Sequence, residues 1–309
     1  MTLPVRPLGW ASLVANIVLV VTGGAVRLTG SGLGCPTWPR CTEDSFRPHG
    51  ALDVNEAIEF GNRMLNPVLG IIAVLTFVAA WQSGRRDLRA LALVMGLGIP
   101  AQAVIGGIVV LTDLNPWVVS FHLLCSLAII GVAVLFLWRI DHPGPTPLRN
   151  RTTALAWTVF GASWSVLYVG TIVTGSGPHA GDRDVPRNGL DPLQLSQLHS
   201  DLVFLFVGLT AGLVFAAPPA ARRAVGILLI AELGQGTIGF VQYFTDLPVV
   251  LVGFHLLGAA LVSATATWTL LMVREAGLDR EGADREGADS EGTTAGPHPR
   301  EQALPSSSS

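Results

Sequence analysis

The 309-residue sequence is poor in charge and contains no lysine. Charged residues make up 13% of the chain and hydrophobic residues 50%, whereas about 25% of a soluble domain is charged. This composition argues against an ordinary soluble domain. The 19 basic residues are all arginine, which we interpret as genome composition rather than chemistry. The net charge of −3 says little about partners, and we expect no nucleic-acid partner.

Long hydrophobic runs take the place of the missing charge. A bilayer core of about 30 Å needs roughly 20 apolar residues per helix, and uninterrupted runs favour helices over the alternating strands of a barrel. The first run lacks a signal-peptide cleavage site, so we interpret it as a retained span. The sequence therefore predicts an all-α integral membrane protein with eight transmembrane helices, near residues 8–26, 60–81, 90–111, 117–138, 153–173, 196–217, 224–243 and 249–273.

The distribution of arginine over the short loops predicts the orientation. Arginine is enriched before the first span and after the second, fourth and sixth (Arg6, Arg85, Arg86, Arg89, Arg139, Arg149, Arg151, Arg222, Arg223). The loops after the first and fifth spans carry some arginine as well. By the positive-inside rule, we predict a multi-pass protein of the cell membrane with both termini in the cytoplasm. The loops around Cys35 and Asp184 would then lie outside.

An internal repeat divides the chain. A shift of 133 residues places Gln102 on Gln235, TDL at 112–114 on TDL at 245–247, and FHLL at 121–124 on FHLL at 254–257. Four helices per repeat is an even number, so both halves insert the same way and their pseudo-twofold axis runs along the membrane normal. We predict two pseudo-symmetric four-helix bundles, 1–140 and 141–274. The tail, 275–309, repeats REGAD and ends in four serines, a composition that predicts disorder.

Three histidines lie within predicted spans, and an ionisable group there is costly enough to indicate function. A hydrogen bond across helices is about as good an explanation for any single one. However, His122 and His255 are repeat equivalents, and His199 shares a half with His255. Two imidazoles from different helices can ligate both faces of a haem. Zinc fits less well, because it needs four ligands.

Other polar residues allow more than one interpretation. Glu59, Asn62 and Arg63 open the second span, where an ionisable residue can indicate function. Because Glu59 and Arg63 are four residues apart, a simple ion pair along one helix explains them as well. Glu232 lies in the middle of the seventh span and must be protonated or hydrogen-bonded; we assign it no role.

Cysteine is scarce. Cys35 and Cys41 are separated by five residues in the first external loop, where a disulfide can persist. A structural staple and a redox role are similarly plausible for this pair. Cys125, in the fourth span, fits a small apolar filler.

Taken together, these motifs resemble the haem A synthase family over residues 8–273. The resemblance rests on VTGGAVRLTGSGLGCPTWPRC at 21–41, IEFGNR at 58–63 and the two FHLL segments. It implies an oxidoreductase of haem biosynthesis that oxidises the ring methyl of haem O to a formyl group, by successive hydroxylations with water as the oxygen source. It also implies a substrate-haem side in the N-terminal half and a haem b cofactor in the C-terminal half.

The resemblance assigns roles residue by residue. His199 and His255 would ligate the haem b iron, and His122 the substrate haem iron. Glu59 would be the catalytic acid or base, and Cys35 and Cys41 would match the external disulfide. Haem O, haem O synthase, an electron acceptor and the lipid bilayer are the implied partners.

One position departs from the family pattern. Asn62 stands where many members have histidine. Either the substrate haem has one protein ligand, or a loop histidine, His49 or His179, replaces it. The competing functions are a b-type cytochrome that only passes electrons and a haem carrier. An electron carrier would need saturated ligation in both halves.

Overall fold

The computed structural model describes residues 3–47, 53–144, 151–182 and 184–294. Within these ranges the chain forms eight helices and no strand: α1 (Val5–Leu28), α2 (Val54–Gln82), α3 (Arg86–Leu111), α4 (Pro116–Asp141), α5 (Arg151–Ser176), α6 (Pro192–Ala216), α7 (Pro219–Phe244) and α8 (Val249–Thr294). Each contains a stretch long and apolar enough to cross a membrane. The predicted all-helical, multi-pass membrane fold is confirmed.

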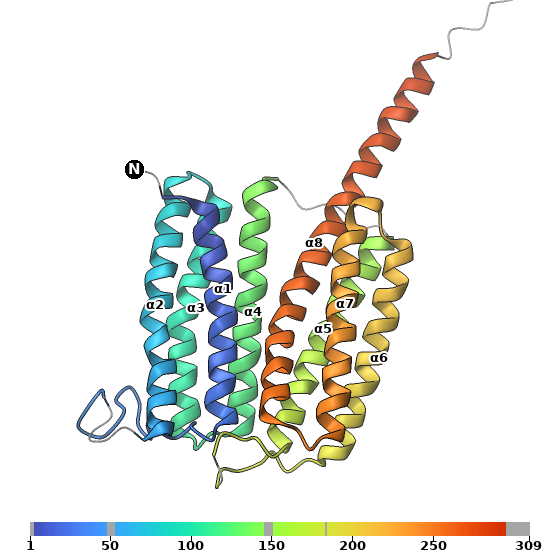
Figure 1. Ribbon diagram of the computed structural model, residues 1–309. Coiled ribbons are helices and arrows are strands. Elements are labelled where there is room, and N and C mark those ends of the chain that lie inside the picture. Colours follow the sequence, from blue (N-terminus) through green and yellow to red (C-terminus); the bar gives the residue numbers. More distant parts are fainter. Residues whose placement is uncertain (1–2, 48–52, 145–150, 183, 295–309) are drawn as a thin grey trace, which may run out of the picture.

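The helices form two groups of four (Figure 1). In the first group α1 packs against α2 and α4, and α3 packs between α2 and α4. In the second, α5 packs against α6 and α8, and α7 packs between α6 and α8. The groups meet where α1 and α4 contact α8 and where α4 contacts α5. The helices of His122 and His255 are therefore direct neighbours.

One end of the molecule holds the long connections. Here α1, α3, α5 and α7 end and α2, α4, α6 and α8 begin, which is the lower end in Figure 1. We call it the loop end. The chain begins at the opposite end. His122, His199 and His255 are the seventh or eighth residues of their helices, so all three lie about two turns from the loop end.

The repeat in the sequence produces the same local structure twice. The turn between α3 and α4 places Asp113 and Leu114 at φ 50° and 56°, and the turn between α7 and α8 places Asp246 and Leu247 at 59° and 56°. Positive φ is uncommon outside glycine. Each turn is closed by an equivalent bond, Leu114 N–H to Val109 O (2.9 Å) and Leu247 N–H to Gln242 O (2.8 Å). The pseudo-twofold relation between whole bundles stays a prediction.

The boundaries that differ most from those expected are the start of α2 and the end of α8. α2 begins at Val54 rather than near residue 60, because its first turn contains Asn55 and Glu56, which lower hydropathy without opposing a helix. Glu59 consequently lies inside the helix.

The second difference concerns the tail. α8 continues to Thr294 and extends beyond the other helices (Figure 1), although the sequence predicted a disordered tail from residue 275. Extending an existing helix avoids the cost of nucleation. The remainder of that predicted tail, 295–309, lies outside the described residues.

Candidate functional site

A cavity of about 220 Å³ lies in the N-terminal bundle at the loop end. It brings together the residues expected on the substrate side, Glu59, Asn62 and Arg63 of α2 and His122 of α4. α1, α3, α8 and two loops complete its wall, through residues that include Arg27, Gln102, Gly106, Leu256, Trp38 and Gly181. The structure thus brings these four residues to one space, and their roles on the substrate side stay a prediction.

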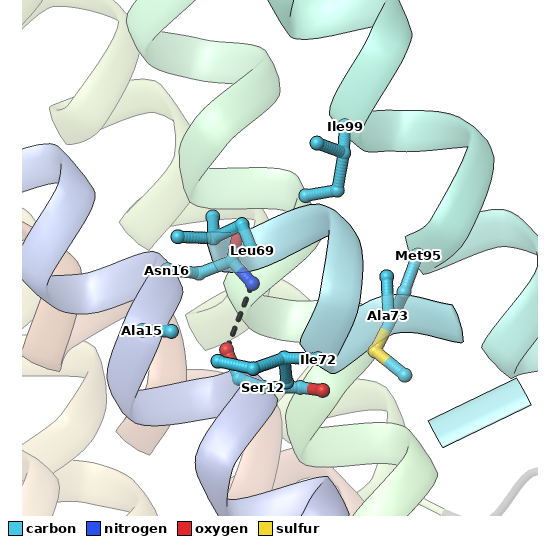
Figure 2. Close-up of a pocket in the computed structure, with 8 residues that line it drawn as sticks. All are labelled: Ser12, Ala15, Asn16, Leu69, Ile72, Ala73, Met95 and Ile99. Carbon is cyan, nitrogen blue, oxygen red and sulfur yellow. Dashed lines mark hydrogen bonds between the residues drawn. The ribbon is translucent and has the colours of Figure 1, made fainter. Parts of the chain in front are cut away.

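A second cavity is much smaller, about 10 Å³ (Figure 2). It lies between α1, α2 and α3, where the Asn16 side-chain amide donates to the Ser12 carbonyl at 2.8 Å. This volume has room for about one water molecule. Only the larger cavity is a candidate for a macrocyclic ligand.

Glu59 is fixed by the first loop and by its own helix. Its side chain is buried, with the residue 4% exposed. Oε2 accepts a hydrogen bond from the Cys35 N–H at 2.7 Å, and Oε1 accepts from Arg63 Nε and Nη2 at 3.1 and 2.5 Å. The helical ion pair is therefore present. It does not exclude a chemical role, because the carboxyl group also lines the cavity.

Arg63 holds the loop that closes this end of the cavity. Nη2 donates to the Cys35 carbonyl at 2.8 Å, and Nη1 donates to the carbonyls of Thr37 and Arg40 at 3.0 and 3.2 Å. A disulfide joins Cys35 to Cys41, and both cysteines are buried. The loop is thus closed covalently and held to α2 by charged hydrogen bonds.

Trp38, within this loop, reaches the cavity and packs on α3. A Cβ atom at Gly107 would overlap the indole ring. Gly107 therefore provides the space that lets the ring lie against the helix.

His122 faces the same cavity. Its Nδ1 is buried and has no hydrogen-bond partner among the described residues. A Cβ at Gly106 would lie 3.5 Å from its Cε1, in ordinary contact. Gln102 donates to the backbone carbonyl of His122 at 3.2 Å, which fixes the helix and leaves the imidazole unoccupied.

Asn62, which stands where many family members have histidine, is hydrogen-bonded to a neighbouring helix. The Asn62 side-chain oxygen accepts a hydrogen bond from the Thr22 hydroxyl at 2.8 Å, so the amide is engaged by α1. His179 is engaged as well, because its Nε2 lies 2.8 Å from the Leu247 carbonyl. His49 lies outside the described residues. Of the ligand candidates that the structure describes, His122 alone has a nitrogen without a partner facing this cavity.

The C-terminal bundle brings His199 and His255 close together. Their ring centres are 6.5 Å apart, the ring planes are inclined by 74°, and both Nδ1 atoms are buried without a partner in the described part of the chain. Metal–imidazole bonds are about 2 Å long, so two imidazoles on opposite sides of one iron have ring centres roughly 6 Å apart. The separation of the two rings therefore fits ligation of one haem iron by both imidazoles.

Glycines make room for both rings. A Cβ at Gly170 of α5 would lie 3.0 Å from His199 Cε1, and one at Gly239 of α7 would lie 3.6 Å from His255 Cε1. Gly239 is the repeat equivalent of Gly106, which stands in the same relation to His122. Each histidine therefore faces a glycine on a neighbouring helix.

Glu232 lies apart from both histidine sites. It is 2% exposed, and its Oε1 accepts from the Thr210 hydroxyl at 2.7 Å. Its Oε2 is buried and has no partner within the described ranges. This agrees with the expectation that it must be protonated or hydrogen-bonded.

Among the cavity residues that sequence reasoning missed are Arg27, Trp38 and Leu256. Arg27 lies one residue beyond the predicted first span, and Trp38 reaches the site only because its loop folds back. Leu256 follows His255 on α8, so neighbouring residues of one helix serve different halves. Only Arg27 gave a usable signal, as an ionisable residue at the end of an apolar run.

A sequence model of the COX15-CtaA family, described as cytochrome oxidase assembly protein, matches residues 6–182, more than half of the chain. The chain belongs to the COX15-CtaA family. The matched region contains Glu59 and His122, whereas His199 and His255 follow it.

Curated relatives of the family extend the similarity into the second half. Haem A synthase of Staphylococcus epidermidis is 25% identical over 296 residues, 86% of this chain and 96% of that protein. The haem A synthase of Bacillus cereus is 24% identical over 280 residues, 87% and 84% of the two chains. That of Staphylococcus haemolyticus is 28% identical over 185 residues, 54% of this chain and 59% of the relative. Family membership confirms the prediction of a membrane oxidoreductase of haem A biosynthesis.

Proposed function

We propose that this chain converts haem O to haem A by oxidising a ring methyl to a formyl group, with haem b as its resident cofactor. One observation carries the proposal. The N-terminal cavity places the Glu59 carboxyl group and the His122 imidazole, whose Nδ1 has no partner among the described residues, around one space of about 220 Å³. Family membership supplies the reaction class, and the relatives named above are haem A synthases.

The proposed division of labour follows the two bundles. His199 and His255 would hold haem b, which supplies one-electron redox chemistry when bound. His122 would hold the iron of haem O with one strong bond, because Asn62 is tied to Thr22. A single strong protein ligand suits a substrate that must enter and leave.

Glu59 is the proposed proton acceptor. Oxidation of a methyl to a formyl group with water as the oxygen source releases protons and electrons, so a positioned base is needed near the ring edge. The Cys35 N–H and Arg63 fix the Glu59 carboxylate at the cavity wall. Its position is therefore set before the substrate binds.

α8 is the proposed boundary between the redox sites. It presents His255 to the C-terminal pair and Leu256 to the N-terminal cavity. Electrons from the substrate haem would then pass α8 to reach the haem b held by His199 and His255. We further propose that the protein lies in the cell membrane with both termini cytoplasmic and the loop end outside, and that haem O synthase delivers the substrate.

The rival function, a cytochrome that only passes electrons, is less well supported. It needs two strong ligands in each half, and the ranges described contain one partner-free imidazole in the N-terminal cavity.

The test compares haems extracted from membranes that contain the chain and a source of haem O. The wild type should yield haem A on chromatography. Glu59→Gln keeps an oxygen that can accept from the Cys35 N–H but removes the base, so the rate of haem A formation should fall about a hundredfold or more. Haem O binding and the haem b spectrum should be unchanged.

Arg63→Gln is the matched control, because it breaks the loop contacts and the ion pair while the chain keeps the Glu59 carboxyl group and its bond from the Cys35 N–H. Haem A formation should therefore fall less than in Glu59→Gln. Haem A formation at the wild-type rate by Glu59→Gln would reduce Glu59 to a structural partner of Arg63. A wild type that forms no haem A while retaining haem O would favour a haem carrier instead.

A further inference from the structure

Arg27 forms part of the wall of the N-terminal cavity. Arg27 lies in the last turn of α1, and it lines the same space as Glu59 and His122. Its Nε donates to the His179 carbonyl at 2.6 Å, and its Nη2 donates to the Thr174 carbonyl at 2.7 Å. Both acceptors belong to the C-terminal half, one at the end of α5 and one in the loop that follows. The guanidinium is thus held in place by backbone.

The two arginines of the cavity differ in the donors that they have left. A guanidinium carries five N–H donors. Arg63 uses all of them, on Glu59 and on the carbonyls of three loop residues. Arg27 uses two, so three of its donors have no hydrogen-bond partner among the described residues.

They also differ in charge compensation. Glu59 neutralises Arg63, whereas no ion pair found among the described residues includes Arg27. Glu59, Arg63 and Arg27 are the charged residues in the cavity wall, apart from the titratable His122. The wall therefore has one positive charge left over. A cation without a counter-ion at the end of a membrane-spanning helix raises the free energy of the protein. An anionic ligand in the cavity would offset that increase.

We propose that Arg27 binds a propionate of the tetrapyrrole substrate and thereby sets which edge of the ring faces Glu59. The inference rests on the proposed function, since it takes haem O as the ligand of this cavity. A guanidinium fork matches a carboxylate better than a point charge does. Its two bonds to backbone carbonyls orient it before the ligand arrives, which lowers the entropic cost of binding.

The test uses two iron porphyrins that differ only at the carboxylates. Purified protein with its C-terminal haem bound is titrated with iron protoporphyrin IX or with its dimethyl ester, and binding is followed by absorbance. The wild type should bind the free acid about tenfold to a hundredfold more tightly than the ester. Arg27→Gln should lose that preference through weaker binding of the acid alone.

Two further variants separate the binding role from a structural one. Arg27→Lys keeps the charge without the fork and should retain part of the preference. Arg187→Gln is the matched control, because Arg187 bonds to the Pro178 and Val185 carbonyls in the same loop but does not line the cavity. It should leave the preference unchanged. An unaltered spectrum of the C-terminal haem reports that each variant is folded.

Several outcomes would overturn the proposal. Equal binding of acid and ester by the wild type would exclude a carboxylate subsite. Equal weakening of both probes in Arg27→Gln would show that Arg27 only joins the two halves. Binding of neither probe would refute the cavity as a haem site, and with it this proposal. A wild type that discriminates through Arg27 yet forms no haem A would support the subsite and contradict the proposed reaction.

Discussion

At the scale of single residues, His122 and Asn62 share the cavity but differ in what engages them. The side-chain oxygen of Asn62 accepts a hydrogen bond from Thr22, whereas Nδ1 of His122 has no partner in the part of the chain that the structure describes. His122→Ala should therefore weaken haem O retention by about tenfold or more, while Asn62→Ala should change it by less than about threefold. Titration of purified protein with haem O measures both. Equal losses in the two variants would make Asn62 a second ligand.

The same scale shows what the sequence could predict. His122, His199 and His255 were identifiable because an ionisable side chain within an apolar run is costly, and that cost can be read from the sequence alone. Glu59 precedes the apolar run of the second span, so only the family resemblance singled it out. The hydrogen-bond partners of the site residues could not be predicted from the sequence. Thr22 meets Asn62 only because α1 packs on α2, and Arg63 meets the loop carbonyls only because the loop folds back. The spacing of Glu59 and Arg63 is the exception, since the partners are one helical turn apart.

At the scale of elements, the disulfide loop depends on α3 as well as on α2. Trp38 lies against Gly107, where an added Cβ would overlap the ring, whereas the Cβ of the adjacent Gly106→Ala would make an ordinary contact with His122. Gly107→Ala should destabilise the docked loop by about 1–3 kcal/mol and raise the reactivity of the Cys35–Cys41 disulfide towards reductant. Gly106→Ala should not. Thiol labelling after mild reduction measures the difference, and equal reactivity in the two variants would mean that Trp38 does not hold the loop.

Element boundaries show why part of the fold escaped the sequence. Hydropathy follows apolar runs, so it predicted eight spans and placed the α8 start correctly at 249. Hydropathy could not predict the first turn of α2, because that turn is polar. Asp53 caps the helix there by accepting a hydrogen bond from the Val54 N–H at 2.7 Å. A helix begins where its backbone donors are satisfied rather than where lipid begins.

At the scale of the whole molecule, orientation can be tested with exposed positions at opposite ends. Ser83 lies between α2 and α3 and Asp184 lies in the loop after α5; both are exposed. The arginine bias predicts that Asp184→Cys reacts with a membrane-impermeant thiol reagent added to intact cells, while Ser83→Cys reacts only after the cells are broken. If only Ser83→Cys were labelled from outside the cell, the orientation would be the opposite of the predicted one.

The two bundles should lose their haems independently, although α8 belongs to both sites. His255 pairs with His199 in the C-terminal half, and the neighbouring Leu256 contributes only an apolar wall to the N-terminal cavity. His255→Ala should therefore abolish the low-spin b-type spectrum, because one of two axial imidazoles is lost. Haem O binding should stay within about threefold of the wild type. Haem A formation should still stop, because electrons from the substrate would have no acceptor in the C-terminal bundle.

Substitutions at Gly170 and Gly239 test the same histidine pair with smaller changes than the loss of an imidazole. Gly170→Ala would place a Cβ 3.0 Å from His199 and displace the ring, whereas Gly239→Ala would place one 3.6 Å from His255, an ordinary contact. Absorbance spectra should show a perturbed haem b in the first variant and a nearly normal one in the second. An unchanged spectrum in both His199→Ala and His255→Ala would place the iron ligands elsewhere. Joint loss of haem O and haem b binding in His255→Ala would mean instead that α8 couples the bundles into one folding unit.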